Sequence, residues 1–235
     1  MKKTNIIYSI TKAFLSKAIP NSKHLKYLSF YPELEQWRKK HKELYPLFKS
    51  RYMLYDYLNS EIEKNGPISY LEFGVFNGDS IKYWSRINTG EASRFYGFDT
   101  FTGLPDIWEL FSSRLDKGAF NMQGKYPHTA DKRISFVRGL FQDTLSRFLK
   151  EHPVSSPLVI NIDSDLYSSA SYVLSRCNDV LVPGTIVIFD EFSVVLEEFR
   201  ALKDYCSAYI REYEVLGATK SWEEYYSQVA IRIKS

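Results

Sequence analysis

Residues 69–80 read SYLEFGVFNGDS, and this stretch decides the fold class. It opens with a short apolar run, Ser69–Phe73, which has the length and composition of a buried strand. Two glycines, Gly74 and Gly78, follow before a helix-like pattern begins. Glycine lets a ligand approach the backbone, and the first turn of a helix offers unpaired N–H groups. The stretch therefore predicts a strand, a ligand-binding loop and a helix in succession.

Short apolar runs continue to alternate with helix-length amphipathic segments down to the C-terminus. This alternation predicts an α/β fold with a seven-stranded, mostly parallel sheet and helices on both faces. Right-handed crossovers bring every loop that follows a strand to one edge, where ligands bind. The predicted strands are Ser69–Phe73, Phe95–Phe98, Ile134–Val137, Leu158–Ile162, Thr185–Phe189, Tyr213–Leu216 and Val229–Ile233.

The N-terminal part has a different character. Residues 1–66 predict a helical extension, with an amphipathic helix over 5–19 and one or two helices over 32–63, before an α/β domain over 67–235. Residues 1–50 hold 11 Lys/Arg and 3 Asp/Glu, a net charge of +8, whereas the remainder has −5. We expect a helix that packs on the core or on a second subunit of a homo-oligomer. The alternative is peripheral contact with a membrane surface or a diphosphate-linked glycan carrier.

Composition narrows the class of protein. The chain has 235 residues and is 44% hydrophobic, which suffices for a core without disulfides. It shows neither a convincing secretory signal nor the roughly 20 apolar residues that a membrane span needs. We therefore expect a soluble, cytoplasmic protein. No basic stripe lies within the α/β part, which argues against a nucleic acid as substrate.

Carboxylates follow four of the predicted strands. Glu72 and Asp99 end the first two, and Asp163 and Asp190 end the fourth and fifth. A single acid there often caps a helix, but four together favour a functional site. The loop lacks both GxGxxG and a P-loop lysine, so no phosphate cradle is predicted. S-Adenosylmethionine has a ribose, an ammonium and a sulfonium but no phosphate, and it suits such acids better than NAD or ATP.

The carboxylates that follow the fourth and fifth predicted strands suggest a metal-binding site. Strands lie roughly 4.8 Å apart, so Asp163, Asp165, Asp190 and Glu191 can gather near one cation. Oxygen ligands without histidine or cysteine select Mg²⁺, Mn²⁺ or Ca²⁺. The alternative is that these acids cap helices and pair with Arg or Lys. No histidine follows a predicted strand, so a histidine base is not expected.

Four segments of the chain form a recognisable set: YLEFGVFNG (70–78), YGFDTFTGLP (96–105), GLFQDTL (139–145) and NIDSDLYSSA (161–170). Together they resemble the macrocin O-methyltransferase family, whose members methylate sugar hydroxyls of glycosides with S-adenosylmethionine and a metal. The resemblance covers roughly residues 50–235 and implies the class I methyltransferase Rossmann-like fold.

The resemblance implies a role for each site residue. Asp165 matches the general base, and residues 106–130, with Trp108, resemble a mobile lid. It places the methionine part of the cofactor beside Glu72, Gly74, Gly78 and Ser80, its ribose and adenine beside Asp99, Thr100, Phe101 and Gln142, and Mg²⁺ or a similar ion on Asp163, Asp190 and Glu191.

One position departs from the family pattern, because Glu191 stands where the family usually has aspartate. The longer side chain can bind a displaced ion or turn away. Two alternatives stay open: a differently reacting protein like the cephalosporin hydroxylase-like relatives, and a non-catalytic S-adenosylmethionine-binding protein. The acceptor is equally open between a natural-product glycoside and a surface polysaccharide.

Overall fold

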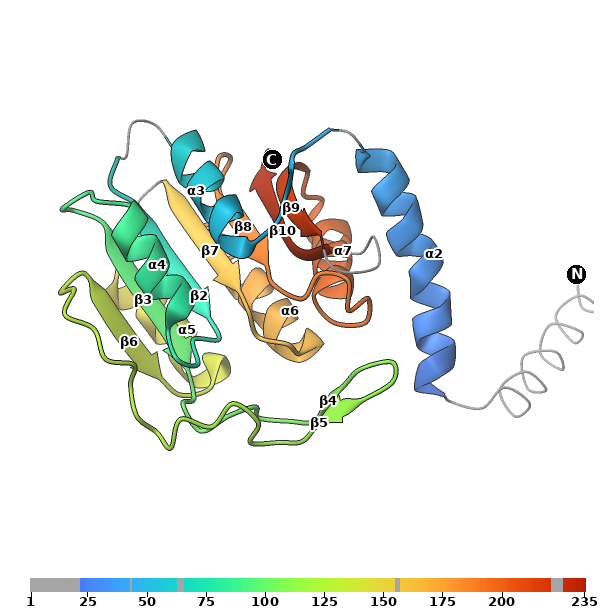
Figure 1. The fold of residues 1–235 in the computed structure, drawn as a ribbon, viewed down its shortest axis with the longest axis horizontal. Helices are drawn as coiled ribbons and strands as arrows, with labels where there is room; N and C mark the ends of the chain where they lie inside the picture. Colours follow the sequence, from blue (N-terminus) through green and yellow to red (C-terminus); the bar gives the residue numbers. More distant parts are fainter. Residues whose placement is uncertain (1–21, 43, 63–65, 155–156, 221–225) are drawn as a thin grey trace, which may run out of the picture.

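The computed structural model describes residues 22–42, 44–62, 66–154, 157–220 and 226–235 (Figure 1). The helix predicted over residues 5–19 lies outside these ranges. Within them, no helix combines the length and the apolar character needed to cross a membrane.

A single mixed sheet forms the centre of the molecule, and its eight strands run in the order β1-β9-β10-β8-β7-β2-β3-β6. All seven predicted strands are present, and β10 is antiparallel to both of its neighbours. The eighth strand, β1, was not predicted; it pairs with β9 at the edge. The strands are β1 (Leu47–Phe48), β2 (Ser69–Phe73), β3 (Arg94–Asp99), β6 (Ile134–Arg138), β7 (Leu158–Ile162), β8 (Ile186–Phe189), β9 (Tyr213–Lys220) and β10 (Tyr226–Ile233).

Helices cover both faces of this sheet (Figure 1). On one face lie α3 (Arg51–Glu61) and α4 (Asp79–Ile87), and on the other α5 (Phe141–Glu151), α6 (Tyr167–Arg176) and α7 (Glu198–Tyr209). A further helix, α2 (Lys23–His41), joins the second face through Tyr27, Leu34 and Trp37. The helices predicted over 32–63 thus begin at Lys23 and Arg51 instead, and the segment between them contains β1.

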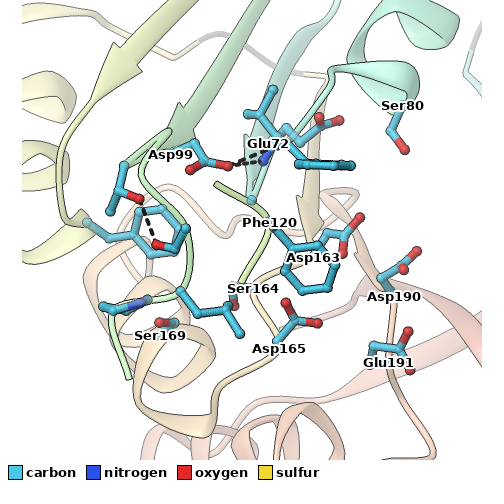
Figure 2. Close-up of a pocket in the computed structure, with 18 of the residues that line it drawn as sticks. Glu72, Ser80, Asp99, Phe120, Asp163, Ser164, Asp165, Ser169, Asp190 and Glu191 are labelled. Carbon is cyan, nitrogen blue, oxygen red and sulfur yellow. Dashed lines mark hydrogen bonds between the residues drawn. The ribbon is translucent and has the colours of Figure 1, made fainter. Parts of the chain in front are cut away.

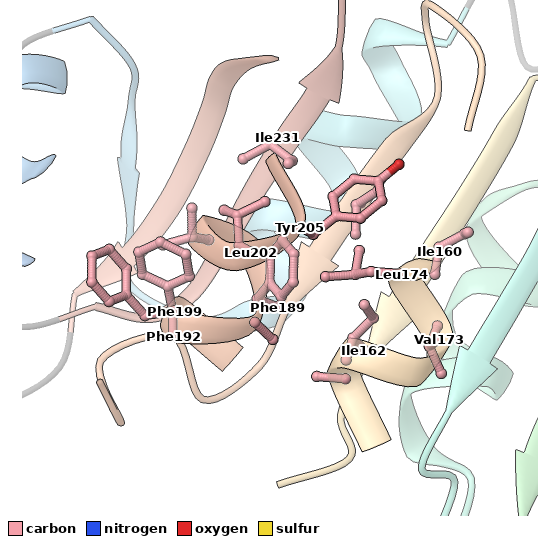
Figure 3. Close-up of a cluster of buried hydrophobic side chains, with 14 of the residues drawn as sticks. Ile160, Ile162, Val173, Leu174, Phe189, Phe192, Phe199, Leu202, Tyr205 and Ile231 are labelled. Atoms are coloured by element: carbon pink, nitrogen blue, oxygen red, sulfur yellow. The ribbon is translucent and has the colours of Figure 1, made fainter. Parts of the chain in front are cut away.

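The two faces hold separate hydrophobic clusters because side chains alternate along a strand. On β7, Val159 joins the cluster under α3 and α4, whereas Ile160 and Ile162 point to the other (Figure 3). Phe189 and Leu202 pack in that same second cluster. Burial of each such side chain stabilises the fold by about 1.5–3 kcal/mol.

The order of the strands reverses beside β2. The chain runs from β2 outward to β3 and β6, then returns to β7 and β8 on the other side of β2. Ligands of open α/β sheets bind at such a reversal, outside the carboxyl ends of the strands. Here those ends are Phe73-Gly74 on β2 and Ile162-Asp163 on β7.

Candidate active site

A cavity of about 450 Å³ opens at this reversal (Figure 2). Ten of the residues that the sequence predicted as site residues line it, from the carboxyl ends of strands β2, β3, β7 and β8 and from the segments that follow β2, β3, β6, β7 and β8. None of the four histidines, all within the described ranges, is among the lining residues. The ten are Glu72, Gly74, Ser80, Asp99, Thr100, Gln142, Asp163, Asp165, Asp190 and Glu191.

Two predicted cofactor contacts, Gly78 and Phe101, do not line the cavity. Gly78 caps α4 with a left-handed backbone, φ 77°, and a side chain there would meet Pro127 and Lys82. Phe101 is also left-handed, φ 56°, and its buried ring packs against Tyr126 and Phe136. Both positions shape the loops that surround the cavity.

The carboxylate of Asp99 holds the glycine loop in place. Its Oδ2 accepts the backbone N–H groups of Val75 at 2.8 Å and Phe76 at 3.0 Å, and its Oδ1 accepts that of Phe101 at 2.7 Å. A carboxylate has about four acceptor positions. Asp99 therefore stands fixed at the wall of the cavity, with acceptor capacity left for a ligand.

Glu72 lies at the floor and is 1% exposed. The hydroxyl of Tyr70 donates to its Oε2 at 2.5 Å. Burial raises the pKa of Glu72 to about 8, despite the lowering effects of its hydrogen bonds and of Arg51. A cationic ligand would supply the countercharge that this carboxyl lacks.

Arg51 enters the same cavity from α3, and sequence reasoning missed it. Its Nη2 donates to Asp190 Oδ2 at 2.9 Å, and its Nη1 lies 3.6 Å from Asp163 Oδ2. The second oxygen of Asp190 accepts Gln228 Nε2 at 2.9 Å. The pairing of these acids with a basic residue, one of the two alternatives left by the sequence, is therefore present for Asp163 and Asp190.

Asp165 and Glu191 lie on the same side of the cavity as Asp163 and Asp190, away from Asp99 (Figure 2). Burial and mutual repulsion raise the pKa of Asp165 to about 8 and that of Glu191 to about 7. Glu198, which is buried on α7, accepts the Glu191 backbone N–H at 3.0 Å, and burial raises its pKa well above the usual range. Arg51 does not offer enough positive charge for all of these carboxyls to be ionised at once, and a further cation would favour their ionised forms. In the described ranges, no three acids, histidines or cysteines are arranged to hold a metal ion.

The segment predicted as a lid reaches from the cavity to α2. Its hairpin, β4 (Trp108–Glu109) and β5 (Arg114–Leu115), places the Phe111 ring 5.7 Å from that of Tyr27. Lys23 pairs with the Glu109 carboxylate at 3.1 Å. At the cavity the rings of Phe120 and Phe76 lie 5.6 Å apart, edge to face. The segment thus connects α2 with the cavity mouth.

Solved structures of O-methyltransferases have the same fold. The O-methyltransferase NovP is 19% identical, with a TM-score of 0.58, and the match covers 79% of this chain and 80% of that one. CalS11, a calicheamicin methyltransferase, is 21% identical, with a TM-score of 0.57 and coverage of 98% and 92%.

Sequence comparison then gives the family. The macrocin-O-methyltransferase (TylF) family matches residues 53–212, and the chain belongs to this family. The chain is also 26% identical, over 147 residues, to the 8-demethyl-8-(2,3-dimethoxy-alpha-L-rhamnosyl)-tetracenomycin-C 4'-O-methyltransferase of Streptomyces olivaceus. This match covers 54% of each protein, so the chain spans about half the length of that relative.

Proposed function

We propose that the chain transfers a methyl group from S-adenosylmethionine to a hydroxyl of a sugar or glycoside. One observation carries the proposal: carboxylates at the ends of four parallel strands line a single cavity at the reversal of the sheet. Membership of the macrocin-O-methyltransferase family supports the same reaction.

The donor fits the cavity by charge and by hydrogen bonding. Glu72, buried without a full countercharge, suits the ammonium of the methionine part, with Gly74 and Ser80 beside it. Asp99 keeps acceptor capacity for the ribose hydroxyls, with Thr100 at the same wall. Gln142, which also lines the cavity, is our candidate for the adenine contact. Bound in this way, the donor supplies a methyl group on a positively charged sulfur.

We predict that donor binding releases a proton near pH 7. The pKa of Glu72 is raised to about 8, so the free carboxyl is mostly protonated at pH 7. An ammonium partner favours the ionised form and lowers that pKa, so the proton leaves. Binding therefore tightens as pH rises toward 8 and weakens again above it, where the α-ammonium of the donor loses its own proton. Calorimetry at pH 7 in buffers with different ionisation enthalpies measures the release.

The matched control for this prediction is Glu72→Gln. The variant has no proton to lose at this position, so the release should shrink by the share that Glu72 contributes. Equal proton release in both proteins would show that another group accounts for it.

The chemistry of the acidic side chains also supports a divalent cation as part of this proposal. Asp163 and Asp190 already share one cationic group, and their hard oxygen donors are those that Mg²⁺ selects. We propose that they hold the ion together with Glu191, which follows Asp190 directly. A bound ion would stabilise negative charge that develops on the acceptor oxygen.

Asp165 is the proposed base. It lines the cavity and is 9% exposed. As the acceptor oxygen bonds to the methyl carbon, the carbon–sulfur bond breaks and sulfur keeps its electron pair, while Asp165 takes the hydroxyl proton. Holding donor and acceptor together in this cavity lowers the barrier further.

Aromatic side chains that line the cavity support a sugar as the acceptor. Phe76 and Phe120 are more than 40% exposed, and Tyr52 and Trp108 line the same cavity. Exposed apolar groups around a polar pocket mark ligand-binding surfaces. The Streptomyces relative is itself named for methylation of a rhamnosyl group.

The test is a screen for S-adenosylhomocysteine formation. The full chain with Mg²⁺ would be offered glycosides, nucleotide sugars and, for comparison, catechols and a nucleic acid. We expect turnover with at least one sugar acceptor. Binding of the donor without transfer to any acceptor would favour a non-catalytic protein, and transfer to catechols alone would reject the sugar.

A further inference from the structure

The position that a cation would take between Asp163 and Asp190 is already filled. Nη2 of Arg51 lies 2.9 Å from Asp190 Oδ2, and Nη1 lies 3.6 Å from Asp163 Oδ2. Of the described residues that line the cavity, Arg51 alone is basic. A guanidinium stays charged at every physiological pH, so the basic partner of this pairing does not titrate.

Both oxygens of Asp190 already accept a hydrogen bond. The side chain is buried, Oδ1 accepts Gln228 Nε2, and Oδ2 accepts Arg51 Nη2 at 2.9 Å. Magnesium binds carboxylate oxygens at about 2.0–2.1 Å. An ion bound to Oδ2 would therefore share that oxygen with the guanidinium, and the two positive charges would repel each other.

The side chain of Arg51 also has space to move away from the two acids. It is the first residue of α3, its side chain is 34% exposed, and it faces the cavity on the side of Ser80, 3.5 Å from that hydroxyl. Meanwhile Asp165 and Glu191 line the same cavity, and Glu198 accepts the Glu191 backbone N–H, so further carboxyl groups surround the pair that Arg51 contacts. A doubly charged ion would balance this group better than one guanidinium does.

We propose that Arg51 is the resident cation of the Asp163–Asp190 pair and that a divalent ion binds there only by displacing its guanidinium. The proposal rests on the metal site proposed above. Arg51 thereby sets the metal affinity of the site. In the metal-free protein it prevents the two acids from repelling each other, and its own charge weakens metal binding.

The test measures Mn²⁺ binding to the free protein by electron paramagnetic resonance, without donor or acceptor. Arg51→Gln removes the competing charge, so we expect it to bind Mn²⁺ at least tenfold more tightly than the unchanged chain. Arg51→Lys keeps a charge but loses the fork that reaches both acids, so its affinity should fall between the two.

The matched control is Lys82→Gln on the neighbouring helix α4. It removes one positive charge near Gly78 without touching either acid, so Mn²⁺ affinity should stay within twofold. Equal affinities for Arg51→Gln and the unchanged chain would overturn the proposal, as would absence of Mn²⁺ binding in both. Since the assay contains no S-adenosylmethionine, failure here is distinguishable from failure of methyl transfer, which the acceptor screen reports.

Discussion

Replacing Asp165 by asparagine should lower methyl transfer by about 10²–10⁴-fold while leaving S-adenosylmethionine affinity nearly unchanged. The amide keeps the size and shape of the side chain but cannot accept the hydroxyl proton. Asp165 has a left-handed backbone, φ 60°, which asparagine adopts readily, so the loop should keep its shape. Turnover is measured as S-adenosylhomocysteine formation with saturating donor and acceptor.

Two readouts separate a chemical effect from a structural one. Removal of one charge from a group of repelling acids should not lower the thermal midpoint, because burial and neighbouring carboxylates already disfavour ionised Asp165. Donor affinity serves as the internal control. Near-normal turnover with unchanged stability would remove Asp165 from the role of base.

Gly74→Ala should destabilise the fold by more than about 4 kcal/mol, a large share of the roughly 5–15 kcal/mol that holds such a domain folded. A Cβ at this position would lie 1.7 Å from the backbone oxygen of Asp163. The backbone of Gly74 is also left-handed, φ +94°, which adds about 1–2 kcal/mol for an L-residue. The clash falls between β2 and β7 at the centre of the sheet. Urea unfolding measures the loss.

Gly184→Ala provides the matched control. Its φ of +95° is nearly the same, but a Cβ there meets nothing within 4 Å. Its cost should therefore be the backbone strain alone, about 1–2 kcal/mol. Equal losses for the two variants would show that the approach of Gly74 to Asp163 does not limit stability.

Seven strands of the sheet were predictable because each is a short apolar run bounded by polar or turn-forming residues. The two-residue strands β1, β4 and β5 are too short to carry such a pattern. β1 forms by pairing with β9, which is distant in sequence, and β4 and β5 pair with each other in a short hairpin. The start of α2 was missed because Pro32 lies inside this helix, and a proline in a helical pattern normally indicates a helix boundary.

The sequence predicted correctly which side chains at the strand ends reach the cavity. Asp99, Asp163 and Asp190 reach the cavity because parallel strands end at one edge. Phe101 does not reach the cavity, because its backbone is left-handed and its ring packs in the interior. Arg51 gave no local signal: an arginine in a charged helical segment is ordinary, and its partner Asp190 lies 139 residues away. The N-terminal boundary at residue 66, the homo-oligomer and the membrane contact stay predictions.

The most direct test of the account is a calorimetric titration of the full chain with S-adenosylmethionine. We expect saturable binding of one molecule per chain, weakened about tenfold or more in Asp99→Asn, because hydrogen bonds to a charged acceptor contribute about 1.5–3 kcal/mol. Absence of saturable binding at ligand concentrations up to about 1 mM, or equal affinity in the two proteins, would contradict the placement of the methyl donor at this edge of the sheet.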